Sequence, residues 1–110
     1  MIAQSDWPMA QRCFLEALAV ASNAQITPIV LDALLGVAAL RAGAGDTESA
    51  LELVLHVIQE KARTQDVHNR AEHRRVEWEA RLSAQHIDVI RARLQSKTLD
   101  AVVQDLLNAL

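Results

Sequence analysis

The chain has 110 residues, enough for one domain with a hydrophobic core, and 51% of them are hydrophobic while only 3% are aromatic. The formal net charge of −3 at pH 7 gives no general attraction to nucleic acid or to an anionic membrane surface. One cysteine cannot form an internal disulfide, and no apolar run is long enough to cross a bilayer, so we expect a cytoplasmic protein without a membrane segment.

Apolar residues recur at spacings of three and four along most of the chain, which predicts amphipathic helices. A first helix is expected to begin at the Ser-Asp-Trp-Pro segment of residues 5–8. Its apolar stripe includes Cys13, which we therefore expect to be a buried structural residue. A second helix, from about Pro28 to Ala42, is apolar around nearly its whole circumference, so it must be covered on most sides by its neighbours.

A short turn follows the second helix. Gly43 and Gly45 can both adopt the left-handed conformation that ends a helix. Asp46 or Thr47 then caps the next helix with its side chain. This turn therefore predicts two helices that fold back on each other.

No linker rich in Pro, Ser or Gly divides the rest of the chain, so residues 1–110 are predicted to form a single all-α domain. We expect an α-α superhelix of stacked helix-turn-helix units, with two degenerate units over about 5–82 and capping helices over about 83–110. After the turn, helices are expected at about 47–62 and 65–82. Two further helices are expected to follow, one capped by Ser83 and the last capped by Thr98.

Several residues resemble the pattern of the tetratricopeptide repeat, a helix-turn-helix unit that stacks into superhelices. Asp32 and Ala39 depart from that pattern, because large aromatic residues are usual at both places, and two extra residues lie between Gly36 and the turn. The resemblance implies the architecture of the family more than a peptide-binding groove. The matching residues are Leu35-Gly36, Gly45-Asp46, Ala50, and the small–large–small series Ala10, Phe14 and Ala17.

The C-terminal third resembles the closing segment of large bacterial regulators, which are signalling ATPases and transcriptional regulators of the LuxR or SARP type. This resemblance implies that the chain is the C-terminal end of a helical sensor region, or a free-standing copy of one. The sequence departs from the pattern at Leu94, where a glycine is common, and at Arg74-Arg75, where leucines are common. The matching residues are Arg70-Ala71-Glu72, Leu82-Ser83 and Thr98-Leu99.

No catalytic, cofactor-binding or metal-binding site is predicted. The phosphate-binding motif G-x-x-x-x-G-K-[ST] is absent from the sequence, and no nucleophile–base pair can be assembled. No two histidines have the i, i+4 spacing of a helical metal site. His68 and Glu72 have that spacing, but such a pair is more often a solvated side-chain contact. We therefore expect a protein that is not an enzyme.

Charged and aromatic residues crowd the helix predicted over 65–82, which makes it the candidate partner-binding surface. Arg74 falls on the stripe that should be apolar, so either its stem lies along the edge of the core or this face meets a partner. Trp78 is an interface anchor or, as its spacing to Leu82 favours, a residue at the edge of the core. The candidate contact residues are His68, Arg70, Arg74, Arg75 and Trp78.

These features favour a non-enzymatic protein-interaction or sensor module that works with a protein partner or with the remainder of a larger regulator. One alternative is a self-associating homodimer, paired through an unmatched face of the first or last helix. Another is nucleic-acid binding through the basic segment 61–75, although acidic residues are mixed into that segment and the whole chain is acidic.

Overall fold

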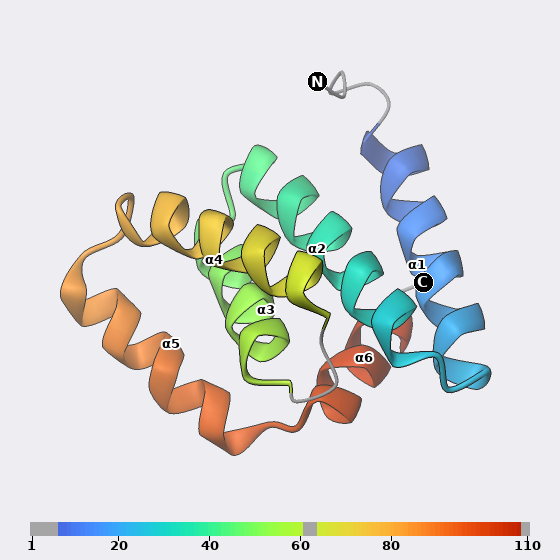
Figure 1. Cartoon of the computed structure of the whole chain (residues 1–110). Helices are drawn as coiled ribbons and strands as arrows, with labels where there is room; N and C mark the ends of the chain where they lie inside the picture. The colour runs from blue at the N-terminus through green and yellow to red at the C-terminus, as the bar shows by residue number, and fades with distance from the viewer. Residues whose placement is uncertain (1–6, 61–63, 109–110) are drawn as a thin grey trace.

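The computed structural model describes residues 7–60 and 64–108, which form six α helices and no strand. The all-α fold that the sequence predicts is confirmed, whereas the expected start at Ser5-Asp6 lies outside the described residues. No helix in the described part of the chain combines the length and the apolar character needed to cross a membrane. The helices are α1 (Trp7–Asn23), α2 (Thr27–Gly43), α3 (Thr47–Gln59), α4 (Gln65–Glu79), α5 (Ala84–Ser96) and α6 (Leu99–Asn108) (Figure 1).

Four of these helices are preceded by a residue whose side chain accepts a hydrogen bond from a backbone N–H three residues later. Such caps provide acceptors for N–H groups that have no partner within the helix. Three of them, at Asp46, Ser83 and Thr98, are caps that the sequence predicts. The bonds join Asp46 Oδ1 to Ser49 N at 3.2 Å, Thr64 Oγ1 to Val67 N at 3.2 Å, Ser83 Oγ to His86 N at 3.2 Å, and Thr98 Oγ1 to Ala101 N at 3.1 Å.

The turns between α1 and α2 and between α2 and α3 share one hydrogen-bond pattern. In each turn, a backbone N–H just before the second helix reaches back to a carbonyl in the last turn of the first helix, as in a Schellman motif. This bond reverses the chain within three residues, so consecutive helices run antiparallel. The two bonds are Ile26 N to Ala21 O and Asp46 N to Arg41 O, both at 2.9 Å.

The same two turns differ in the residue that adopts left-handed backbone. That residue is Gly45 in the second turn, with φ of 95°, and Gln25 in the first, with φ of 58°. The expectation for Gly45 is confirmed, whereas Gly43 is the last residue of α2 and is not left-handed. Only glycine adopts positive φ without a steric cost, so the first turn carries a strain that the second avoids.

Helix α2 is the central helix of the fold. It packs against α1 on one side and α3 on the other, and it also contacts α4 (Figure 1). Eight of its residues are buried, as expected for a helix that is apolar on nearly all sides. The side that stays open carries Asp32, Gly36 and Ala39, which follow one another at helical spacing and are exposed or half-buried.

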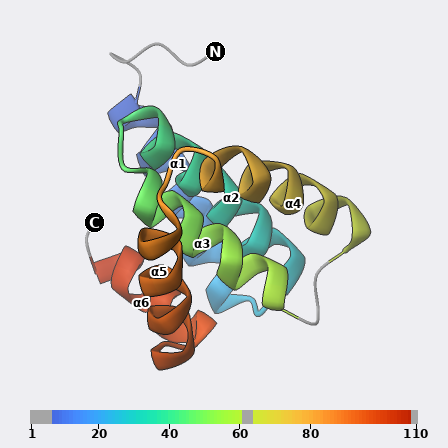
Figure 2. The ribbon, with the colours of Figure 1, turned by 90° about the vertical axis from the view of Figure 1, so that its left-hand side faces the viewer.

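The two C-terminal helices both return to α3. Helix α5 packs on α3 and α6 lies against α1 and α3 (Figure 2). An ion pair connects this part to α4, with Arg91 Nη2 of α5 at 2.9 Å from Glu79 Oε1. A second ion pair joins the end of α5 to α6, with Lys97 Nζ at 2.6 Å from Asp105 Oδ2. Helix α3 is thus covered by four others, and its apolar residues form the middle of the core.

The prediction that Cys13 is buried is wrong, because its side chain is exposed. The buried face of α1 consists of Leu15, Leu18 and Ala21. Each residue turns a helix by about 100°, so Cys13 lies on the side of α1 roughly opposite these residues. The apolar spacing of this helix therefore contains two stripes, and only one of them is covered.

His56 of α3 is a fully buried polar residue in this core. Gln59 Nε2 and His56 Nδ1 lie 3.4 Å apart, within hydrogen-bond distance. His56 Nε2 has no hydrogen-bond partner among the described residues. Burial lowers the pKa of His56 below its ordinary value of 6.5, an effect that Glu52 opposes and Lys97 reinforces.

Relaxing the strained turn should stabilise the protein. We expect Gln25→Gly to raise the free energy of unfolding by about 0.5–1 kcal/mol, because the cost of left-handed backbone exceeds the extra chain entropy that glycine loses. The matched change Gly45→Gln should lower the free energy of unfolding by a similar amount, since no atom near Gly45 would clash with a Cβ. Urea denaturation of the three proteins measures both effects, and equal midpoints would contradict the argument.

Folding stability should decrease as the pH falls below about 6.5. The unfolded chain protonates His56 near its ordinary pKa, whereas the folded chain, with its lowered pKa, resists the proton, so acidification favours unfolding. We expect His56→Leu to flatten the dependence of thermal midpoint on pH between 5 and 8, while the control His73→Gln, at an exposed position, keeps the slope. An unchanged slope in His56→Leu would contradict the assignment.

Candidate functional site

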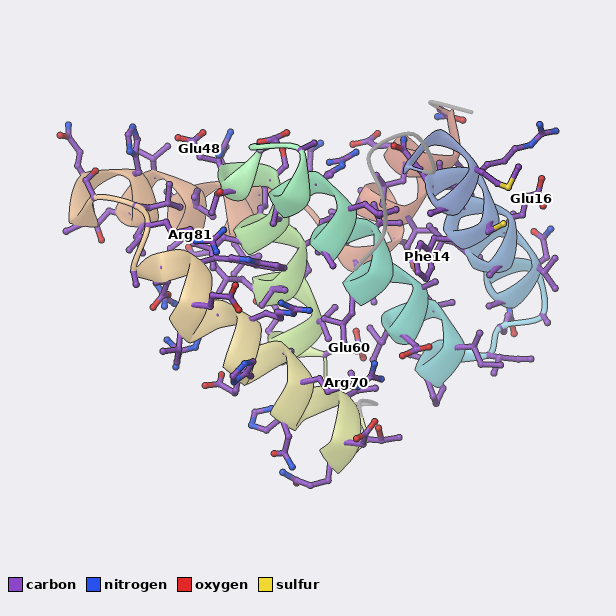
Figure 3. The ribbon with its side chains drawn as sticks, turned by 90° about the horizontal axis from the view of Figure 1, so that it is seen from above. Phe14, Glu16, Glu48, Glu60, Arg70 and Arg81 are labelled. Carbon is purple, nitrogen blue, oxygen red and sulfur yellow. The ribbon has the colours of Figure 1, made fainter. Side chains whose placement is uncertain are left out.

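A groove of about 560 Å³ runs over the open side of α2 between α1 and α4. Figure 3 shows its two sides, with Phe14 between α1 and α2 and Arg70 reaching from α4 toward α2. The apolar floor comes from Leu35, Gly36 and Ala39 of α2. The lining residues are Phe14 from α1, Asp32, Leu35, Gly36 and Ala39 from α2, and Asn69, Arg70, His73 and Arg74 from α4.

The groove is hollow because small residues occupy the open side of α2. A Cβ atom on Gly36 would collide with the ring of Phe14, so the ring lies directly over the backbone of α2 there. Ala39 follows one turn later with a single methyl group. The Phe14 ring fills the space over Gly36, and the short side chain of Ala39 leaves the space beyond it open between the walls from α1 and α4.

Arg70 forms the first charged contact across the groove. Its Nη2 donates to Asp32 Oδ1 of α2 and its Nε donates to Asp66 Oδ2 within α4 at 3.1 Å. The hydrogen bond to Asp32, strengthened by the charges of both carboxylates, raises the pKa of Arg70 above its ordinary value. Arg70 is therefore a fixed charge that joins α4 to α2 at one end of the groove.

Arg74 carries the second positive charge of the groove, one helical turn further along α4. Its guanidinium carbon lies 5.8 Å from the centroid of the Trp78 ring, within the range of a cation–π contact. Its closest carboxylate is Glu77, at 3.4 Å on the same helix, and 46% of its side chain is exposed. Glu77 does not line the groove, so Arg74 is the lining charge whose carboxylate partner leaves it most accessible to a ligand.

The structure brings two of the five predicted contact residues into the groove. Arg70 and Arg74 line it, whereas Arg75 belongs to a separate network in which it pairs with Glu72 at 2.8 Å and with Glu79 at 2.9 Å. His68 is half-buried, interacts within the protein and does not line the groove.

Trp78 is only 1% exposed, which matches its interpretation as a core residue. Its ring lies beneath Arg74, as the cation–π contact shows. The two sequence interpretations of Arg74 are therefore compatible, since the side chain lies against a core aromatic and still faces the groove. Trp78 itself is too deeply buried to touch a partner directly.

The sequence interpretation missed the contributions of α1 and α2 to this site. Asp32 carried the available signal, because a charged residue in the middle of an otherwise apolar helix marks the side that stays open. Ala39, at the other noted departure from the repeat pattern, lies on the same side. The part played by Phe14 depends on how α1 crosses α2, which spacing within one helix does not reveal.

The site has the chemistry of a binding surface. Guanidinium groups, one carboxylate, an amide and an imidazole surround an apolar floor, and these groups can pair with charged and apolar parts of a ligand. Across residues 7–60 and 64–108, no group of three or more His, Cys, Asp or Glu side chains is placed to hold a metal ion.

Comparison of the chain with models of protein families, with curated proteins and with solved structures finds no match. The relationships to tetratricopeptide repeats and to bacterial regulators stay predictions from the sequence. The geometry of the groove is therefore the main basis for a function.

Replacing Trp78 distinguishes a core role from a contact role. We expect Trp78→Ala to lower the free energy of unfolding by about 3–5 kcal/mol, the usual cost of deleting a large buried ring. Arg74→Ala, which removes the guanidinium above that ring, should cost less than about 1 kcal/mol because the arginine is half exposed. Denaturant titrations followed by circular dichroism measure both, and a Trp78→Ala variant as stable as the wild type would contradict the core assignment.

Proposed function

We propose that the chain is a non-enzymatic protein-interaction module that binds a segment of a partner protein in the groove between α1, α2 and α4. The observation that carries the proposal is the apolar floor of Leu35, Gly36 and Ala39 beside a positively charged wall. Grooves of this kind accept side chains of a peptide or helix, with apolar contacts for affinity and charges for orientation.

The charges of the groove specify the chemistry of the partner. Arg70 is held by Asp32 and Asp66, whereas Arg74 has a single weaker contact with Glu77. We therefore expect the partner to place a carboxylate against Arg74 and an apolar side chain over Ala39, beside the ring of Phe14. A bidentate guanidinium–carboxylate contact would fix the direction of the bound segment.

We propose further that α1 to α4 are arranged as tetratricopeptide-like units of a cytoplasmic bacterial regulator, with the chain forming the C-terminal end of its sensor region or a free-standing copy. The turn at Gly45 and the close approach of Phe14 to Gly36 support the repeat architecture. The contact between α2 and α4, in addition to that between consecutive helices, is expected when helical hairpins stack side by side.

The alternative of nucleic-acid binding through residues 61–75 is less well supported. The part of that segment that the structure describes, from residue 64 on, contains three arginines, and each pairs with at least one carboxylate of the same protein. Locally neutralised arginines release few counterions from a nucleic acid. Lys61 and Arg63 lie outside the described residues.

Selection of peptides from a displayed random library on the full chain tests the groove. We expect enriched peptides to combine acidic and apolar residues and to bind Arg74→Glu and Ala39→Trp at least tenfold more weakly, since one change reverses the charge and the other fills the floor. The control Arg93→Glu, exposed on α5 and outside the groove, should bind them as the wild type does.

Fluorescence anisotropy with labelled peptides gives the affinities, and circular dichroism verifies that each variant is folded. Enriched peptides that bind both groove variants with unchanged affinity would refute the proposal. Binding lost equally in Arg93→Glu would refute it as well.

A further inference from the structure

The outer side of α1 is an apolar stripe that no other described element covers. Met9 is 72% exposed and Val20 is 70% exposed, and the side chains of Cys13 and Ala17 between them are also exposed. These positions follow one another at helical spacing on the side of α1 turned away from Leu15 and Leu18. In Figure 1, α1 lies at the edge of the molecule, so this side is accessible to another chain.

The order of side-chain sizes along the stripe is the same from either end of the helix. Large residues stand at its ends, Met9 and Val20, and small residues stand near its middle, Cys13 and Ala17. When two such helices pair antiparallel about a twofold axis, each Met9 faces the partner's Val20 and the small residues meet at the centre. Small central residues let two helix axes approach closely.

The charges beside the stripe have the same symmetry. Arg12 Nε and Glu16 Oε1 are 3.1 Å apart on the flank of the stripe, and their side chains are 77% and 62% exposed. Figure 3 shows Glu16 on the outer side of α1. In an antiparallel pair each Arg12 lies beside the Glu16 of the other copy, whereas a parallel twofold pair would place these side chains on opposite flanks of the interface, where they could not pair.

We propose that two copies of this chain associate through the outer side of α1, antiparallel, about a twofold axis that crosses the interface at the level of residues 14 and 15 along the helix. The charge pattern gives the antiparallel orientation, and the size pattern agrees with this register. The surface is separate from the groove, because Phe14, which lines the groove, lies on the side of α1 that faces α2. Failure of either proposal therefore leaves the other intact.

The dimer should be weak and dependent on concentration, since a single pair of helices buries less surface than a standard protein interface of about 1,600 Å². Sedimentation velocity of the full chain from micromolar to millimolar concentration should show a monomer–dimer equilibrium. A monomer across that range would overturn the proposal.

A charge swap tests the register. We expect Arg12→Glu alone and Glu16→Arg alone each to weaken the dimer about tenfold, because each change brings like charges together at two symmetric places. The double variant with both changes should restore dimerisation, since it re-forms every pair with reversed polarity. The exposure of both side chains makes misfolding an improbable cause, and circular dichroism verifies helix content. Dimerisation that is insensitive to the single changes would overturn the proposal.

Cross-linking at Cys13 gives a second readout of the interface, one that does not depend on the folding stability of the charge variants. Two Cys13 residues lie close to the proposed axis, so a short bis-maleimide should link two wild-type copies covalently. The control Cys13→Ser/Gln11→Cys moves the thiol to the other side of α1 and should yield few cross-linked dimers. Equal cross-linking of both proteins would place the interface elsewhere and overturn the proposal.

Discussion

Burial of α2 is the constraint on which the rest of the structure depends. A helix with apolar residues on nearly every side is stable in water only when other helices surround it, because each exposed apolar side chain forgoes about 1.5–3 kcal/mol of burial. α1, α3 and α4 surround α2, and the turns at the two ends of α2 reverse the chain within three residues and hold α1 and α3 against it. The apolar residues of α3 must also be covered, and α5 and α6 both lie against this helix.

The groove lies on the one side of α2 that is not wholly apolar and is not covered by another helix. Asp32 cannot be buried without a partner, so the side that carries it remains open and the carboxylate pairs with Arg70 of α4. Gly36 and Ala39 on the same side are too small to fill the space between the walls. The ion pair joins α4 to α2, and the lack of side-chain volume makes the hollow. The three residues on this side of one helix thus determine both the shape and the charge of the site.

Local signals were sufficient to predict the helices. The capping side chains of Asp46, Ser83 and Thr98 mark three helix starts, and the periodicity of apolar residues marks the spans between the turns. Spacing fails where a helix has two apolar sides. On α1, Cys13 and Leu18 both belong to helical stripes, and only the packing of α1 on α2 determines which stripe is buried. The strained backbone of Gln25 is a similar case, since its sequence gives no sign of positive φ and the turn imposes it.

The candidate site could be predicted only in part, because the sequence shows the residues of each helix but not how the helices pack together. A concentration of charge on α4 was visible in the sequence, and two of its arginines do line the groove. The separation of Arg74 from Arg75, which are neighbours in the chain and have different partners, follows from the 100° between successive residues and from where α2 and α5 lie. A groove built from three helices needs their relative positions, which depend on contacts between residues distant in sequence.

The placement of α5 has a mechanical consequence for the groove. Helix α4 buries Val67, Ala71 and Trp78 along its length, and its Arg70 and Glu79 form ion pairs with Asp32 of α2 and Arg91 of α5. With α5 on the far side of α3, the arginine-bearing wall borders the groove and is joined to the same core as the floor on α2. A groove whose walls are already in place spares a ligand the entropic cost of ordering its binding site.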